Sequence, residues 1–303
     1  MFEMIFKSKT ILLSLSLGAL IMLGSCGGEA EKEEQTPTAP TAATASISAT
    51  VSLNVMTVSW SPVPGAATYN VYWATAPMNG DPLNASGSAT VGATSYVLPP
   101  VTTGNTYFVL VEGANQVGTG PLSAEFSITG QTFYILAWDE GWWSLTTGYP
   151  GTKNTFTGWD GSDSLRSFFV FDLSTYSGQV AAAALSLNLD GFWGVPSKEV
   201  CFYDVTTDAT TLTTPSGVNT AVYDDLGTGV NYTCVTASSG MALPFQWHID
   251  LNDVARADAD AALGTGNIAF GAKNQFETGT VTEGVRFGGG LNNNSNLVLD
   301  IWQ

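Results

Sequence analysis

Tryptophan is the residue type whose spacing most clearly suggests chemistry in this chain. Trp142, Trp143, Trp159 and Trp193 fall within one short stretch, and several of them stand beside Gly or Asp. An aromatic face can pack on the C–H face of a sugar ring while nearby Asp and Asn bond its hydroxyls. Because side chains alternate along a strand, Trp142 and Trp143 cannot both face a core unless the backbone there is irregular. We therefore predict ligand contacts among these four tryptophans; the alternative is that the large rings cover a loop edge.

A calcium-binding loop is the second candidate. The segment WDGSDS places Asp160 and Asp163 around a glycine. Calcium takes hard oxygen ligands from loops of this kind. Asp and Gly also dominate ordinary turns, and the spacing does not match a full EF-hand loop. A structural calcium at Asp160 and Asp163 is the one cofactor that the pattern suggests, with an ordinary turn as the alternative.

Motifs for catalysis are missing from the sequence. The chain has one histidine, His248, and it has no Gly-x-Ser-x-Gly elbow, His-Glu-x-x-His pair or phosphate-binding loop. Asp139, Glu140 and Asp160 stand near tryptophans and could form a glycosidase pair, but sequence spacing does not establish the separation that such chemistry requires. We predict that the protein is not an enzyme, with a glycan-active enzyme as the less favoured alternative.

The N-terminal segment has the layout of a secretory signal peptide. Lys7 and Lys9 precede an apolar run over residues 11–23. As a helix this run spans about 20 Å, which is shorter than the ~30 Å hydrocarbon core of a bilayer. A permanent membrane span is therefore not expected.

The run ends in Leu-Gly-Ser-Cys at residues 23–26 and resembles the bacterial lipobox. This resemblance implies a lipoprotein signal peptide over residues 1–25 and a diacylglycerol on the sulfur of Cys26; the alternative is ordinary secretion with a free thiol. Gly27, rather than Asp, follows the cysteine, which implies the outer membrane, with the chain surface-exposed or extracellular. Residues 26–45 contain almost nothing to bury and are predicted to form a disordered tether.

Lipidation of Cys26 would leave two cysteines, Cys201 and Cys234. In an exported protein, an even pair in strand-like surroundings favours a disulfide. Two cysteines without nearby histidines are too few ligands for zinc. We predict a disulfide between neighbouring strands.

Composition limits both the fold and the partners. The net charge is −17 with only nine Lys and Arg, so the chain cannot neutralise a row of phosphates, and neither nucleic acid nor an anionic membrane surface is an expected partner. Abundant Gly, Thr, Val and aromatic residues favour many short strands joined by turns. Residues 254–263 are the best candidate for a helix. About 278 residues follow the signal peptide, enough for two domains.

Residues 46–129 show period-2 faces typical of a β-sandwich, such as Met56, Val58 and Trp60. The segments VSWSPVPGAATYNVYW (58–73) and GNTYFVLVEGANQVGTGPLS (104–123) resemble a bacterial fibronectin type III domain. The resemblance places Trp60 in the core and Tyr107 at the tyrosine corner of that family. Its loop over residues 113–120 carries no Arg-Gly-Asp, so a spacer role is expected.

The pattern of residues 131–303 also predicts short strands, in a domain large enough for a jelly roll. The segments RSFFVFDLS (166–174) and AAALSLNLD (182–190) resemble a jelly-roll module of bacterial extracellular proteins. That resemblance implies a carbohydrate-binding-like or structural module. The predicted fold is therefore all-β, with a fibronectin type III sandwich followed by a larger jelly roll.

These observations favour a non-enzymatic cell-surface lipoprotein. It would be anchored to the membrane by its N-terminal lipid and would bind glycan, matrix or a surface protein through the second domain. The main alternative is a structural subunit of a surface or extracellular assembly.

Overall fold

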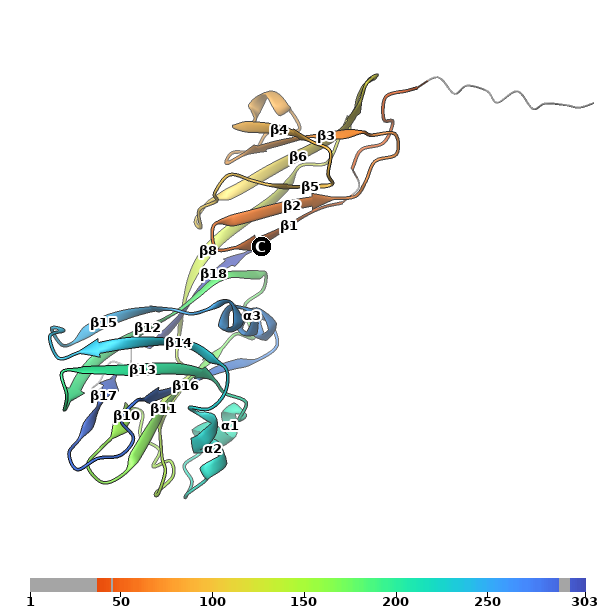
Figure 1. Cartoon of the computed structure of the whole chain (residues 1–303). Coiled ribbons are helices and arrows are strands. Elements are labelled where there is room, and N and C mark those ends of the chain that lie inside the picture. Colours follow the sequence, from red (N-terminus) through yellow and green to blue (C-terminus); the bar gives the residue numbers. More distant parts are fainter. Residues whose placement is uncertain (1–36, 45, 289–294) are drawn as a thin grey trace, which may run out of the picture. The chain divides into compact units, whose positions relative to one another are not determined.

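The computed structural model describes residues 37–44, 46–288 and 295–303 (Figure 1). The predicted signal peptide, the lipidation at Cys26 and residues 26–36 of the predicted tether lie outside the described residues. Residues 38–303 form one compact unit. None of the helices in the described ranges is both long and apolar enough to cross a bilayer.

The last part of the predicted tether is ordered. Pro40 and Thr44 are buried, and Asn115 donates a hydrogen bond of 2.7 Å from Nδ2 to the carbonyl oxygen of Thr38. Gly120 makes room for this segment, because a Cβ there would lie 2.7 Å from the carbonyl oxygen of Pro40. Residues 38–44 of the segment predicted to be a disordered tether thus lie against the first sandwich, where Asn115 bonds Thr38 and where Pro40 and Thr44 are buried.

The first domain is a sandwich of two antiparallel sheets. Its elements are β1 (Ile47–Ser52), β2 (Val55–Trp60), β3 (Thr68–Ala74), the 3-10 helix η1 (Pro82–Asn84), β4 (Gly87–Val91), β5 (Ser95–Val97), β6 (Thr106–Asn115), β7 (Gly118–Leu122) and the start of β8 (Phe126–Leu136). One sheet has the order β1–β2–β5; the other has the order β4–β3–β6, with β7 and β8 both pairing with β6.

Residues that alternate inward from both sheets form the core of this first sandwich. Met56, Val58 and Trp60 are buried, and the ring of Trp60 lies 5.5 Å from that of Tyr69. The hydroxyl of Tyr107 accepts a hydrogen bond of 3.0 Å from the backbone N–H of Thr102, as expected for a tyrosine corner. Trp60 and Tyr107 therefore have structural roles.

The second domain is a larger sandwich with three short helices. Its elements are the remainder of β8, β9 (Asp139–Ser144), β10 (Thr155–Trp159), β11 (Ser164–Asp172), β12 (Gln179–Trp193), β13 (Ser197–Asp204), α1 (Ala209–Thr213), α2 (Thr220–Asp225), β14 (Asn231–Ser238), β15 (Phe245–Asp250), α3 (Asp253–Ala262), β16 (Asn267–Asn274), β17 (Glu283–Phe287) and β18 (Asn296–Trp302). The helix predicted over residues 254–263 is confirmed as α3. The strand pairing confirms the predicted all-β fold class.

Two sheets enclose the main core of the second domain. One has the order β9–β11–β16–β13–β14. In the other, the long strand β12 pairs on one edge with β18 and β17 and on the opposite edge with β15; β8 continues this sheet beyond β18, and β10 continues it beyond β17. Strand β10 also pairs with the start of β11, so the two sheets are continuous at that edge. Leu185, Leu187 and Phe169 are among the fully buried residues between the sheets.

Strand β11 is buried on both faces, which explains its unbroken apolar run over residues 168–171. Phe169 faces the main core, whereas Phe168 faces a second cluster beneath α1 and α2. Arg166 extends under α2 and donates hydrogen bonds of 3.0 and 3.2 Å to the carbonyl oxygens of Tyr223 and Asp224, and it forms an ion pair with Glu277. The side chain thereby holds α2 on the sheet.

Strand β8 belongs to both domains, so no linker separates them. Its first residues pair with β6, and residues 130–136 pair with β18. Hydrogen bonds also join Leu53 to Ala181 and Thr129 to Gln303 across the junction. The predicted boundary near residue 130 falls in the middle of this shared strand.

Candidate functional site

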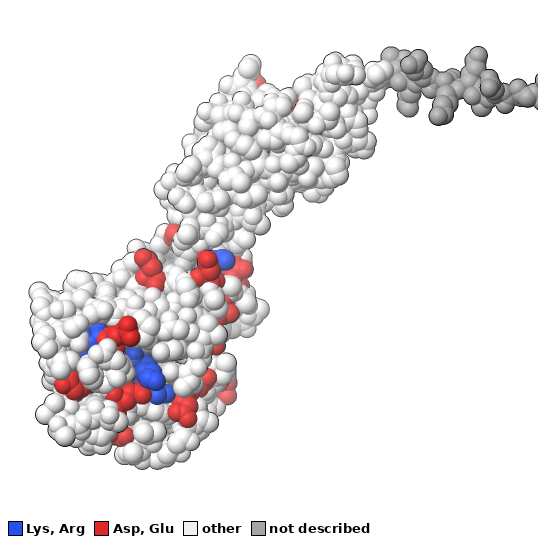
Figure 2. Space-filling model, in the orientation of Figure 1, with Lys and Arg blue, Asp and Glu red and all other residues white. Residues whose placement is uncertain are grey.

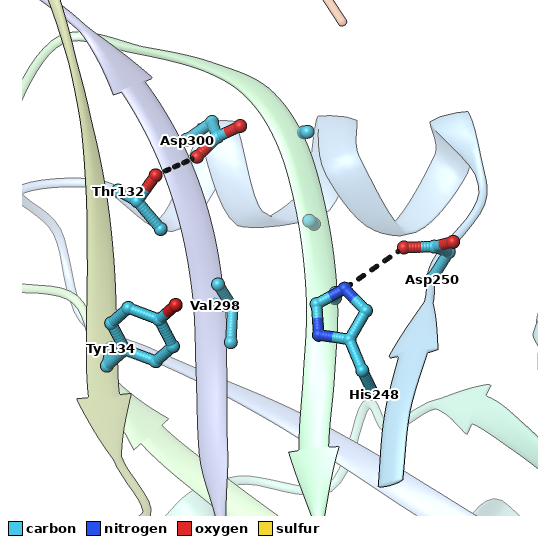
Figure 3. A pocket seen from close by; sticks show the side chains of 9 residues that line it. Thr132, Tyr134, His248, Asp250, Val298 and Asp300 are labelled. Atoms are coloured by element: carbon cyan, nitrogen blue, oxygen red, sulfur yellow. Dashed lines mark hydrogen bonds and ion pairs between the residues drawn. The ribbon is translucent and has the colours of Figure 1, made fainter. Parts of the chain in front are cut away.

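The outer face of the second domain carries a shallow groove of about 230 Å³, here called the sheet groove (Figure 3). Four neighbouring strands, β8, β18, β12 and β15, supply its lining. The lining residues are Thr132, Tyr134, Ala182, Ala183, Ala184, His248, Asp250, Val298 and Asp300.

Strand register explains why these side chains share one face. Tyr134 pairs with Val298, Val298 with Ala184, and Ala184 with Asp250, so the four residues form one row across the sheet. Residues paired across antiparallel strands point to the same face, and their chain neighbours point to the other. The neighbours Ile135, Leu297, Leu185 and Ile249 are all buried in the main core.

The groove has a low floor between two higher walls. Val298 and Ala184 form a nearly flat apolar floor, because alanine has no side chain beyond Cβ. Tyr134 stands on one side of the floor and is 69% exposed. His248 stands on the other, with its side chain 59% exposed (Figure 3).

Oxygen acceptors surround this floor. Asp300 accepts a hydrogen bond of 2.6 Å from the hydroxyl of Thr132 and another of 3.1 Å from that of Thr103. The Nε2 atom of His248 lies 3.2 Å from Oδ1 of Asp250, whose side chain is almost wholly exposed. The groove thus combines the ring of Tyr134, the imidazole of His248, an apolar floor and two carboxylates, and none of the described lining residues is a lysine or arginine.

The basic residues of the second domain are all engaged in ion pairs. Residues 131–303 contain six Lys and Arg and 18 Asp and Glu. Each of the six basic side chains pairs with at least one carboxylate: Lys153, Arg166, Lys198, Arg256, Lys273 and Arg286. Figure 2 shows the blue basic atoms lying against red acidic ones on the face in view. An anionic ligand would therefore have to displace an existing ion pair.

The predicted tryptophans do not form a single cluster at the surface. Trp143 is fully buried under α1, where its Nε1 donates a hydrogen bond of 3.1 Å to the carbonyl oxygen of Leu212. This burial leaves Trp143 no surface for ligand stacking. Trp142, on the opposite face of β9, and Trp159, at the end of β10, are half-buried. Trp193, at the end of β12, is half-buried as well and faces outward beside Arg286.

The two aspartates predicted to bind calcium stabilise the turn between β10 and β11. Oδ1 of Asp160 accepts hydrogen bonds of 2.7 Å from the backbone N–H groups of Ser162 and Asp163. Asp163 is buried and accepts hydrogen bonds from the hydroxyls of Ser144 and Thr146 and from the backbone N–H of Ser164. Protein donors thus occupy these carboxylate oxygens in an ordinary turn, and the calcium site stays a prediction.

The predicted disulfide is confirmed. Cys201 on β13 is directly opposite Cys234 on β14, and their sulfurs are bonded. The carboxylate of Glu199 lies close to both sulfurs. Because the disulfide consumes both thiolates, this trio does not provide a metal site.

Of the carboxylates considered for catalysis, Glu140 faces the interior. It is 1% exposed, and among the described residues only the hydroxyl of Ser295 lies near enough to act as a donor to its carboxylate, without forming a well-aligned hydrogen bond. Burial raises the pKa of Glu140 to about 7. Asp139 pairs with Lys153 at 2.7 Å. Glu140 therefore cannot reach a sugar bound at the surface in this conformation.

The sequence interpretation does not single out Tyr134, Asp250 or Asp300, and it names His248 only as the one histidine of the chain. The signal that could have found them is strict alternation. In FQWHID the polar residues Gln246, His248 and Asp250 alternate with core residues. On β8, Tyr134 and Leu136 likewise face outward on either side of a core residue. Only the strand order, which brings β15 and β8 to the same sheet, shows that these residues line one groove.

Comparisons with known proteins find only distant likenesses. No family model matches the chain, and no curated protein does. The third fibronectin III domain of human KIAA0343 protein is 19% identical, with 34% of this chain and 92% of that chain covered and a TM-score of 0.26. The chicken CNTN1 FN1-FN3 domains are 12% identical, with 70% and 57% covered and a TM-score of 0.27.

A structure described as a carbohydrate-binding module from the beta-sandwich superfamily is 11% identical, with 88% of this chain and 99% of that chain covered and a TM-score of 0.21. These TM-scores are too low to carry an argument about this chain. The architecture of the chain is instead given by its own strand order. The chain is an all-β protein of two sandwiches that share a strand.

Proposed function

We propose that this protein binds uncharged glycan in the sheet groove, as a non-enzymatic module of the cell surface. The observation that carries the proposal is the row from Tyr134 across Val298 and Ala184 to Asp250. Such a row offers a ring and a flat apolar floor to the C–H face of a sugar. It also offers carboxylate acceptors to the sugar hydroxyls.

Charge favours an uncharged ligand. Residues 131–303 carry a net charge of −12, and the described lining of the groove has two carboxylates and His248, which already pairs with Asp250, but no lysine or arginine. A uronate or a sulfated sugar would meet like charge without a free cation to balance it. A neutral sugar avoids this repulsion and supplies the hydroxyl donors that the carboxylates accept.

A binding role also fits the shape of the site. The groove is a shallow surface on a rigid sheet, and its two carboxylates already bond Thr132, Thr103 and His248. Asp250 is exposed to water, whereas catalytic acids are usually desolvated to raise their pKa. The lipid anchor inferred from the lipobox would place this surface outside the cell, where the protein would serve in adhesion.

A glycan array probed with residues 38–303 tests the proposal. We expect signals on neutral glycans that fall at least tenfold in Tyr134→Ala, because a tyrosine at the centre of a binding site can contribute about 2 kcal/mol and about 1.4 kcal/mol is a tenfold change. Leu83→Ala is the matched control, since Leu83 is a 90% exposed apolar residue of the first domain. An array on which wild type and Tyr134→Ala give the same pattern would contradict the proposal.

One observation favours the structural alternative. Leu136 and Trp138 are exposed near the end of β8, and residues 130–136 pair only with β18 within the described chain. A partly unpaired strand with exposed apolar side chains is a common site of association. Sedimentation of residues 38–303 over a wide concentration range distinguishes the two, since assembly predicts oligomers that Trp138→Lys abolishes.

A further inference from the structure

The outer face of β12 continues beyond the sheet groove to Trp193. Ser186 and Asn188 follow Ala184 on the same face, and after a bulge Gly191 pairs with Arg286 and Trp193 with Gly284. Nine residues separate Ala184 from Trp193, which corresponds to a distance on the order of 30 Å along the strand. Tyr134 on β8, in the row of Ala184, and Trp193 at the end of β12 are therefore two aromatic side chains that lie far apart on the outer face of one sheet.

Trp193 lies against the sheet surface. A Cβ on Gly191 would come within 2.3 Å of the Trp193 ring, so glycine is what allows the indole to lie there. Phe156 on β10 supports it from the side at 5.5 Å. Since the residue is half-buried, the sheet holds one part of the ring while another part stays accessible.

A planar polar pair stands beside this ring. Nε of Arg286 donates a hydrogen bond of 2.9 Å to Asp190, and the guanidinium carbon lies 5.5 Å from the centre of the Trp193 ring. The bonds to Asp190 use Nε and Nη2 of Arg286, and the remaining Nη1 donors have no acceptor among the described residues. The ion pair makes this pair of side chains neutral overall while leaving hydrogen-bonding groups for a ligand.

We infer that Trp193, Arg286 and Asp190 form a second sugar subsite, so the ligand is a long, uncharged polysaccharide chain lying along β12. This inference rests on the proposed function, because it uses the sheet groove as the first subsite. The two subsites repeat one chemistry, a ring beside hydrogen-bonding side chains without net positive charge. Ser186 and Asn188, both half-buried, offer polar contacts between them.

The test is a calorimetric series on residues 38–303 with neutral oligosaccharides from disaccharide to decasaccharide, drawn from the polymer that the array selects. Wild-type affinity is expected to rise at least tenfold once the chain is long enough to reach both subsites. Trp193→Ala is expected to abolish this rise and to leave the affinity for the shortest binding oligosaccharide unchanged. Trp193→Tyr, which keeps a ring, is expected to restore part of the rise.

The outcomes separate the two claims. If short oligosaccharides bind through Tyr134 but long ones gain nothing, or if Trp193→Ala keeps the gain, the second subsite is overturned and the sheet groove stands. If no oligosaccharide binds through Tyr134, the proposed function fails first. Thermal unfolding of each variant shows whether it is folded, and Arg286→Gln, which leaves the tryptophan in place, repeats the test if Trp193→Ala unfolds.

Discussion

Trp302, the penultimate residue of the chain, packs its ring 5.8 Å from that of Tyr107 in the first sandwich. It is 1% exposed and belongs to the same buried cluster as Trp60 and Val109. Gly130 on the shared strand makes room for it, since a Cβ there would lie 2.6 Å from the indole. The last strand of the second domain thus completes the core of the first.

The first prediction is that the two sandwiches unfold together. Trp302→Ala removes a large buried ring and should lower the free energy of unfolding by about 3–5 kcal/mol. Because the ring joins both cores, calorimetry should show one transition in wild type and a lower midpoint for the whole unit in the variant. Trp302→Phe is the control: it keeps a ring and removes an indole N–H that has no partner. Two independent transitions in wild type would contradict this prediction.

The second prediction concerns Glu140 and pH. Its pKa is about 7 in the folded chain, raised from 4.5 mainly by burial. The folded state therefore holds this proton more tightly than the unfolded state. The contribution of Glu140 to stability should be fully present below pH 4.5 and should be lost as pH rises through 7, by about 3 kcal/mol in all. Denaturant unfolding at pH 5 and pH 8 measures the change.

Glu140→Gln separates this effect from other titrating groups. The variant should lose less stability than wild type between pH 5 and pH 8, because a glutamine does not ionise. Glu199→Gln, at an exposed glutamate, should follow wild type. Equal pH dependence in wild type and Glu140→Gln would show that Glu140 is not the group responsible.

The third prediction concerns the disulfide, which closes a loop with a sequence separation of 33 residues. Replacing both Cys201 and Cys234 with serine should lower the free energy of unfolding by about 3–4 kcal/mol by freeing the unfolded chain. Reductant should destabilise wild type by a similar amount and leave the double variant unchanged. A double variant that still responds to reductant would refute this account.

The fourth prediction tests the calcium site. Burial raises the pKa of Asp163, but hydrogen bonds from Ser144 and Thr146 outweigh it and lower that pKa. Asp163→Ala should therefore cost about 1–3 kcal/mol, equally in calcium and in chelator, because the bonds come from protein donors. A wild-type midpoint that falls on addition of chelator, with no such fall in Asp163→Ala, would instead establish the calcium site.

The fifth prediction concerns charge in the groove. Asp250→Lys should create weak, salt-sensitive binding to a polyuronate such as alginate, because it adds the cation that the groove lacks. Asp253→Lys is the matched control: Asp253 is also highly exposed but does not line the groove. Wild-type binding to neutral glycan should change little with salt. Tight wild-type binding to polyuronate would contradict the preference for uncharged ligands.

Local patterns predicted the elements well, because alternation and caps act over a few residues. Met56, Val58 and Trp60 face a core as their spacing indicated, and Asn252 caps α3 just before the predicted helix. The disulfide was predicted from an even pair of cysteines in strand-like segments of an exported chain, and it is present. The shared strand was not predicted, because nothing in the local sequence shows that β8 pairs with β6 at one end and with β18 at the other.

The candidate site was harder to predict for the same reason. The clustering of tryptophans in the sequence pointed to Trp142 and Trp143, but α1 covers Trp143. That helix was not predicted, because a helix this short leaves little periodic signal in the sequence. The groove joins residues from β8, β12, β15 and β18, which lie far apart along the chain, from Thr132 to Asp300. Only long-range pairing places Tyr134 in the same row as Asp250.

The central claim is that the row from Tyr134 to Asp250 is a glycan-binding surface. The most direct measurement is calorimetric titration of residues 38–303 with the neutral glycan that gives the strongest array signal, comparing wild type with Tyr134→Ala/His248→Ala. The account predicts measurable wild-type binding, insensitive to salt, that weakens at least tenfold when both walls of the groove are removed. Undiminished affinity in a folded double variant would show that the glycan binds elsewhere and would contradict the account.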